Sequence, residues 1–180
     1  MSFYQSELRE KWIPPKADSK AKVPTVGSED AAWIEAKFNG QRVWSLSAGQ
    51  GGRYWRDFVQ SGIAAIGWDY LGDLGNYDTR EAITKEISQE TGKTKPTNDS
   101  LAAWEFANVM EIGDTLLVCK GNTLLGHGLV TGPYVFDDER PEHCHTRTVE
   151  WTEEPDWKIP SHRQGITTKT LTDFTKYPDW

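Results

Sequence analysis

Cysteine is scarce in this sequence, and a long apolar run is lacking altogether. Cys119 and Cys144 are too few for the disulfide framework of a small secreted protein, so reduced thiols and a cytoplasmic location are expected. No apolar stretch approaches the roughly eighteen residues that a membrane helix needs. The opening residues, "MSFYQSELRE", also lack the basic and apolar segments of a signal peptide. These absences argue against a membrane partner.

Positive charge is also in deficit, because 20 lysines and arginines face 27 aspartates and glutamates. A net charge of −7 counts against a nucleic-acid ligand when the chain is taken as a whole. The charge is segregated, however: residues 137–156 hold eight acidic residues and two arginines, whereas residues 41–60 hold three arginines and one aspartate. One basic face therefore remains compatible with the composition.

What the chain has in excess is tryptophan, with nine residues against six phenylalanines and six tyrosines. A length of 180 residues with 37% hydrophobic residues is enough for one domain with a substantial core. Residues 1–30 are polar and contain Pro14, Pro15 and Pro24, so we interpret them as an arm or linker. Residues 31–180 are then expected to form one folded domain.

The rest of the chain mixes short strands with short helices and shows no regular βαβ rhythm. Strands are expected over 42–47, 63–68, 114–120, 123–132 and 145–151, and the Gly121-Asn122 turn joins the third to the fourth. Helices are expected within "RYWRDFVQSG" (53–62), over 79–91 and from Asn98 or Asp99 to 110, and "TLTDFT" near the end as a capped turn or short helix. This pattern predicts an α+β fold, with a small, strongly curved β-sheet or β-barrel and flanking helices.

Helix ends and buried faces can be assigned within these segments. Asp78 and Glu81 resemble a capping pair for the helix 79–91, and Gly62 and Gly92 suit the positions after two helices. The buried stripes are expected to comprise Trp55, Phe58 and Val59 in the first helix, Ile83 and Ile87 in the second, and Leu101, Trp104 and Met110 in the third.

The stretch "AAIGWDYLGDLG" (64–75) places large aromatic residues where a strand ends and a glycine-punctuated loop begins. An aromatic residue at a strand exit has two interpretations, a wedge that closes the end of a barrel or one wall of a cage for a flat ligand. Trp55 and Trp68 adjoin glycine-rich loops, so core packing and ligand contact both remain open for them. Core packing is the simpler interpretation for Trp33, Trp44, Trp104 and Trp151.

Nothing in the sequence requires catalysis, a metal ion or a cofactor. The histidines of "HCHT" (143–146), with His127 and Cys119, lack the ligand spacing of a zinc site, and a surface loop rich in histidine explains them more simply. Cys119 lies in an apolar strand, where a buried and inert thiol is expected. Asp69 and Asp73 fit turn chemistry better than an acid–base pair.

Several motifs together resemble the EVE-type domains of the PUA/YTH-like superfamily. They are "WSLSAGQGGRYWRDFVQSGIAAIGWDYLGDL", "WEFANVMEIGDTLLVCKG", "LLGHGLVTGPYVF" and "RTVEW", which span about residues 33–151. The resemblance is greatest to the N-terminal specificity domain of McrB-like, modification-dependent restriction proteins. It implies a small β-barrel with flanking helices and a non-catalytic reader that flips a methylated or hydroxymethylated base of double-stranded DNA into an aromatic cage. In such relatives an AAA+ GTPase domain follows and works with a McrC-like nuclease subunit.

The resemblance also implies roles for particular residues. Trp68 would be one wall of the cage, and Trp55, Tyr134 and Phe136 are the alternatives for the second. Ser47, Ala48 and Gly49 would approach the base through a hydroxyl and backbone groups, and Asp69 would accept from an exocyclic amine. Contacts with the nucleic-acid backbone would come from Arg53, Arg56, Lys93, Lys95, Lys120 and Asn122. The acidic segment 137–156 would have to face away from the duplex.

Three other functions compete with this one. A reader of modified or single-stranded RNA would prefer single strands with a 2′-hydroxyl group. A nucleoside- or small-molecule-binding protein, or an enzyme, would use the same pocket and would need a pair of groups with shifted pKa values. A pure interaction module would use the acidic segment as its partner surface.

Overall fold

The structure is a computed structural model that describes residues 41–121, 123–158 and 169–176, with the side chains of residues 154–158 left out of the description. The predicted arm, Trp33 and Asn122 lie outside the described residues. No helix in the described ranges is both long and apolar enough to cross a membrane.

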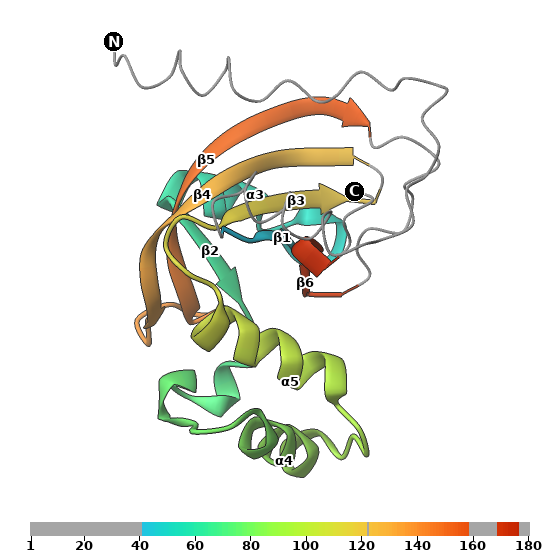
Figure 1. The fold of residues 1–180 in the computed structure, drawn as a ribbon, viewed down its shortest axis with the longest axis vertical. Helices are drawn as coiled ribbons and strands as arrows, with labels where there is room; N and C mark the ends of the chain where they lie inside the picture. Colours follow the sequence, from blue (N-terminus) through green and yellow to red (C-terminus); the bar gives the residue numbers. More distant parts are fainter. Residues whose placement is uncertain (1–40, 122, 159–168, 177–180) are drawn as a thin grey trace, which may run out of the picture.

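A single six-stranded sheet curls into a half-barrel and dominates the architecture (Figure 1). Its order is β2-β5-β4-β3-β1-β6, and all neighbours are antiparallel except the parallel pair β1 and β3. The strands are β1 (Val43–Leu46), β2 (Ile63–Ile66), β3 (Thr115–Lys120), β4 (Thr123–Phe136), β5 (His145–Lys158) and β6 (Leu171–Asp173). The predicted α+β class and strong curvature are confirmed.

Two of the strands are longer than expected. β4 and β5 have 14 residues each and remain paired from Thr123 opposite Lys158 to Phe136 opposite His145. Their register shifts twice, once between Leu124 and Gly126 and once between Val130 and Tyr134. Such bulges bend a strand and increase its twist, so they explain how a long two-stranded ribbon can form the curved wall of the half-barrel.

Glycines in β4 allow tryptophans to lie close to the curved sheet. A Cβ atom on Gly126 would be 2.5 Å from the Trp55 ring, and one on Gly128 would be 2.5 Å from the Trp151 ring. The two rings meet edge to face with their centroids 5.0 Å apart. Trp55 is therefore a core residue packed against the sheet, in agreement with one of the two interpretations of this residue.

In the part of the chain that the structure describes, three α-helices accompany the sheet, namely α3 (Trp55–Ser61), α4 (Arg80–Thr91) and α5 (Thr97–Trp104). α3 precedes β2 and buries Trp55 and Phe58, whereas α4 and α5 form a separate pair at one end of the sheet (Figure 1). Gly62 and Gly92 end α3 and α4 in the left-handed conformation, as predicted. The predicted start of α4 was wrong by one residue, because the Thr79 side chain, and not that of Asp78, accepts from the backbone N–H of Ala82.

The third helix departs from a regular α-helix. After α5 the chain continues as a π-helical turn, Glu105–Val109, in which the wider turn changes the residues that face the core. Ala102 and Ala103 of α5 and Phe106 of the turn are buried, while Leu101 and Trp104 of α5 remain partly exposed. Of the predicted stripe, Met110 is buried and Trp104 packs against the core while partly exposed, whereas Leu101 is not a member of the core cluster. The predicted final turn is partly confirmed: β6 adds to the sheet edge before the 3₁₀ turn Phe174–Lys176.

Candidate functional site

A pocket opens where the two edges of the curled sheet approach each other. β2 forms one edge, and β1 with β6 forms the other. The cavity has a volume of about 180 Å³, or about six water molecules at roughly 30 Å³ each. It is lined by Ser47, Gly49, Ala65, Ile66, Gly67, Trp68, His143 and Thr170. This size suits one small heterocycle better than a drug-sized ligand, whose pockets begin near 300 Å³.

Trp68 is held at the exit of β2 by its backbone. Its φ of 71° lies in the left-handed region, which residues other than glycine seldom occupy. The Trp68 carbonyl accepts from the backbone N–H of Leu71 at 2.9 Å and lies 3.2 Å from His145 Nε2. The side chain is partly buried against the core and lines the pocket. The chain thus turns sharply at this residue and leaves its indole at the pocket wall.

A buried hydrogen-bonded chain supports Trp68 from behind. The Tyr134 hydroxyl accepts from the backbone N–H of Leu74 at 3.0 Å, so its own proton is free to donate to His145 Nδ1, 2.9 Å away. His145 then carries its proton on Nε2 and donates to the Trp68 carbonyl. Burial lowers the pKa of His145, which keeps the ring neutral, and burial raises the pKa of Tyr134.

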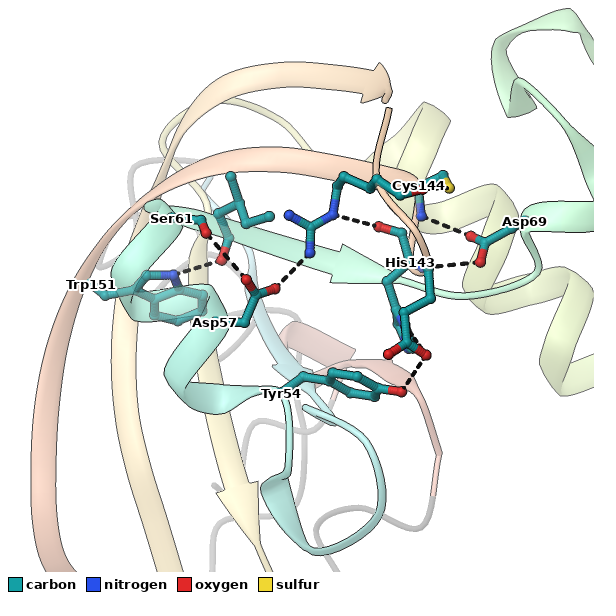
Figure 2. Close-up of polar contacts among 10 residues, drawn as sticks. Tyr54, Asp57, Ser61, Asp69, His143, Cys144 and Trp151 are labelled. Atoms are coloured by element: carbon teal, nitrogen blue, oxygen red, sulfur yellow. Dashed lines mark hydrogen bonds and ion pairs between the residues drawn. The ribbon is translucent and has the colours of Figure 1, made fainter. Parts of the chain in front are cut away.

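His143, from the loop before β5, also lines the pocket. Its φ of 57° also lies in the left-handed region. Both oxygens of Asp69 fix the backbone around it, accepting from His143 N at 3.0 Å and from Cys144 N at 2.7 Å (Figure 2). The His143 ring packs on Tyr54 with the centroids 4.1 Å apart, and its side chain retains 21% exposure. Burial lowers the pKa of His143, so the imidazole is neutral at pH 7.

Residues 137–144 form a loop that is fastened to α3 and to the end of β2. Arg140 pairs with Asp57 of α3 at 2.6 Å and donates to the His143 carbonyl at 3.2 Å (Figure 2). The Tyr54 hydroxyl donates to Glu142 at 2.8 Å and lies 2.6 Å from Arg53. These contacts hold the loop against the pocket edge from two directions.

The structure places the predicted pocket residues in three groups. Ser47, Gly49 and Trp68 line one cavity, as three of its eight lining residues. Ala48 is fully buried between Ser47 and Gly49, and Asp69 lies next to Trp68 with both oxygens bound to the His143 loop. Trp55, Tyr134 and Phe136 are not among the described residues that line the cavity.

Tyr134 and Phe136, in the third group, have structural contacts instead. Tyr134 meets Phe106 edge to face at 6.5 Å and stacks with His145 at 6.0 Å, while Phe136 packs on the same histidine at 5.3 Å. Both residues therefore surround His145, which in turn bonds to Trp68. They lie behind the predicted cage wall and not opposite to it.

The predicted phosphate-binding residues fall on two regions. Arg53 adjoins Gly49 at the pocket, and Lys120 lies near Gly52 of the same turn. Lys93 and Lys95 lie on the connection between α4 and α5, where Lys93 pairs with Asp99 at 2.5 Å (Figure 1). Arg56 belongs to neither region and is exposed on α3.

Part of the acidic segment lies at the pocket, contrary to the requirement that the whole segment face away. Glu142 precedes His143, and its carboxylate is held by Tyr54 at the pocket edge. The positively charged Arg140 and Arg53 lie in the same network. The charge of this edge is therefore nearly balanced, and a phosphate would have to approach from the Arg53 and Lys120 side.

The interpretation of "HCHT" as a surface loop was wrong. Cys144 and His145 are buried, and only His143 retains partial exposure, as a pocket residue. Among the described residues, no group of three or more histidines, cysteines, aspartates or glutamates could hold a metal ion. Cys119 is buried as expected, and burial raises its pKa to about 11, so its thiol stays protonated at pH 7.

Sequence reasoning missed five of the eight lining residues, namely Ala65, Ile66, Gly67, His143 and Thr170. Gly67 stood within the quoted "AAIGWD" stretch and could have been found by its neighbour Trp68. His143 lies 75 positions from Trp68 in the chain, so no local pattern connects the two. Thr170 lies at the pocket because its carbonyl accepts a hydrogen bond from the backbone N–H of Ser47 at 2.9 Å. This bond joins the end of β1 to the segment before β6.

A comparison with known families gives one match, to "Domain of unknown function (DUF8426)", over residues 44–177. The chain belongs to this family. No curated protein and no solved structure matches the chain. The matched DUF8426 range contains every residue that lines the pocket, so the pocket is built entirely from the family's domain.

Proposed function

We propose that this DUF8426 domain is a non-catalytic reader of a modified nucleobase in double-stranded DNA and holds the base, flipped out of the duplex, in the pocket beside Trp68. The observation that carries the proposal is the pocket itself. It is small, it opens between two sheet edges, and a half-buried indole forms one wall. The motif resemblance to EVE-type domains points to the same function, and the curled sheet is compatible with their small barrel.

Energetics support an aromatic wall at this place. Extruding a base costs a few kcal/mol in lost stacking and pairing. Stacking on an aromatic side chain returns roughly 1–3 kcal/mol per base. Because the Trp68 side chain already packs against the core, little side-chain entropy is lost when a base stacks on it.

The methyl or hydroxymethyl group would be recognised by shape. Ala65, Ile66 and Gly67 give the β2 side of the pocket an apolar surface. A methyl group gains about 0.8 kcal/mol on burial against such a surface, which favours a modified base over its unmodified form. Arg53 and Lys120 would contact phosphates at the adjacent turn. In this proposal the domain supplies specificity to a modification-dependent restriction system with a separate AAA+ GTPase domain and a McrC-like nuclease subunit.

Replacing Trp68 by alanine is expected to remove most of the preference for modified DNA. Fluorescence anisotropy at fixed salt would compare an unmodified duplex with duplexes carrying one 5-methylcytosine, 5-hydroxymethylcytosine or N6-methyladenine. The wild-type protein should prefer one of these, and Trp68→Ala should weaken its binding by about 10- to 100-fold, in line with roughly 1–3 kcal/mol of lost stacking.

Trp104→Ala is the matched control, because Trp104 is also a partly buried tryptophan packed on the core but lies on α5 and does not line the pocket. It should leave the preference unchanged. Equal binding of all duplexes by the wild-type protein would contradict the proposal. Preference for a single-stranded RNA, or for a free nucleoside over any duplex, would favour the alternatives.

A further inference from the structure

We infer that His143 supplies the hydrogen-bond acceptor of the pocket, so that the ligand is a heterocycle bearing an exocyclic amino group, such as a cytosine- or adenine-type base. This inference rests on the proposed function and names the chemical class that the pocket selects. Sequence reasoning gave the accepting role to Asp69, whose two oxygens are instead bound to the backbone of His143 and Cys144.

Three separate restraints place the His143 ring at the cavity. Asp69 holds its backbone N–H, Arg140 holds its carbonyl, and Tyr54 packs on one ring face. The left-handed backbone at this residue is a conformation that persists only when the surroundings enforce it. Several independent contacts therefore hold the His143 imidazole at the pocket.

The orientation of the ring indicates which nitrogen faces the ligand. A Cβ atom built on Gly67, itself a lining residue, would lie 3.8 Å from His143 Nε2 and 4.0 Å from Cδ2. The Nε2 edge therefore faces the β2 side of the cavity. The other nitrogen, Nδ1, is buried, has no hydrogen-bond partner among the described residues, and lies 3.8 Å from the Glu142 carboxylate.

The Glu142 carboxylate determines which nitrogen of the neutral His143 ring carries the proton. Glu142 attracts a proton on Nδ1, because an N–H dipole that points toward a negative charge is favourable. Nε2 then carries a lone pair and accepts a hydrogen bond. A base that offers an amino group to Nε2 fills this acceptor, whereas an isosteric carbonyl oxygen would face a lone pair and be repelled.

The acceptor exists only while the ring is neutral. Burial is the main cause that lowers the pKa of His143 from its ordinary value of 6.5. The charged groups that face the ring are Asp69 and Glu142, which oppose this shift, and Arg53 and Arg140, which support it; His145 is also close enough to interact. Protonation below the pKa turns Nε2 into a donor, so binding of an amino-bearing base should weaken as the pH falls below 6.5.

The test compares the best-binding modified base with an analogue that lacks the exocyclic amino N–H. For 5-methylcytosine the analogue is thymine, for 5-hydroxymethylcytosine it is 5-hydroxymethyluracil, and for N6-methyladenine it is N6,N6-dimethyladenine. Base and analogue are each placed opposite an abasic site, because a mismatched base is extruded more easily than a paired one. The wild-type protein should prefer the donor by about tenfold at pH 7, the value of one good hydrogen bond. Its preference should decline toward pH 5, while binding of the analogue stays nearly constant.

His143→Asn separates the inference from the function. Asparagine tolerates the left-handed backbone but is too short to replace the imidazole. The variant should still bind modified DNA through Trp68, with the donor preference and its pH dependence both lost. Retention of the donor preference in His143→Asn, or tighter binding of the amino-bearing base at pH 5, would overturn the inference and leave the proposed function standing. If no modified duplex is preferred by the wild-type protein, the proposed function fails, and the inference fails with it.

Discussion

Replacing Arg147 by alanine is expected to lower the free energy of unfolding by about 3 kcal/mol or more. Arg147 is a charged residue on the buried face of β5 and is only 4% exposed. Its guanidinium donates to the carbonyls of Phe106 and Ala107 at 2.7 and 3.1 Å and lies 3.4 Å from that of Gly132. Burial lowers its pKa, and the charge of Asp114 opposes this effect.

The reason for so large an effect is that Arg147 closes the end of a helix. The last carbonyls of any helix have no partner within it, and a cation near them interacts favourably with the helix dipole. The π-helical turn ends at Val109, so the carbonyls of Phe106 and Ala107 would be buried and unpaired without the guanidinium. Each hydrogen bond from a charged donor contributes roughly 1.5–3 kcal/mol.

Urea denaturation followed by tryptophan fluorescence would measure the change. Arg147→Lys keeps the charge but cannot reach several carbonyls at once, so it should fall between the wild type and Arg147→Ala. Arg42→Ala is the matched control, because Arg42 donates to Val109 of the same helix end at 3.2 Å but is partly exposed, and it should cost under about 1 kcal/mol. An Arg147→Ala variant as stable as the wild type would contradict this account of the helix end.

Replacing Asp114 by alanine is the second change with a large expected effect, again about 3 kcal/mol or more. The Asp114 carboxylate is 3% exposed and accepts from three N–H groups: the backbone of Arg42 at 2.8 Å, the backbone of Glu111 at 3.0 Å and the indole of Trp44 at 2.7 Å. Trp44 is fully buried, so its indole N–H would have no access to water in the variant. Unpaired buried donors cost about 1–3 kcal/mol each.

Asp114→Asn tests whether the stability depends on the hydrogen-bond acceptors of Asp114 or on the space that its side chain fills. The amide keeps one oxygen and nearly the same volume, so this variant should recover part of the stability lost in Asp114→Ala. Thermal unfolding and urea denaturation of the three proteins would give the order wild type, Asn, Ala. Equal stability of the two variants and the wild type would mean that the three N–H groups find other partners.

The hydrogen bonds of Asp114 also explain the "MEIGD" segment (110–114) of the second motif quoted from the sequence. In "MEIGD" (110–114), Gly113 has a φ of 98° and a Cβ atom there would lie 2.8 Å from the Gln41 side chain. The turn returns the chain so that Asp114 can bind Glu111 within the motif and Arg42 and Trp44 at the start of β1. The motif therefore fastens β1 to β3 in their parallel pairing.

Local patterns were enough to predict most elements of the fold. Alternation identified β1 and β5, and a two-residue turn between apolar runs identified the β3–β4 hairpin. The π-helical turn was not predictable from periodicity, and Arg147, which caps its carbonyls, lies about 40 residues further along the chain. β6 is too short to show a pattern and exists because β1 leaves an open edge for it.

The candidate site was predictable only where one segment carries the signal. Trp68 stood out because a large aromatic residue at a strand exit has no obvious place in a core. The position of Tyr134 behind Trp68 depends on His145, and that of His143 depends on Asp69, so both require contacts between distant segments. The sequence pattern of an aromatic residue near a strand end therefore identified candidate pocket residues. It did not distinguish the residue that lines the pocket, Trp68, from the residue that packs behind it, Tyr134.

Fluorescence of 2-aminopurine next to the modified base tests the central claim most directly. A flipped base leaves its neighbour unstacked, so the emission of 2-aminopurine should rise when the wild-type protein binds a duplex that carries the preferred modification. Gly67→Val would fill the pocket, since a Cβ atom at Gly67 meets its nearest neighbour, His143, at 3.8 Å and causes no clash. The account predicts a rise with the wild-type protein and none with Gly67→Val. Binding of modified DNA by the wild-type protein without any rise in emission would contradict it.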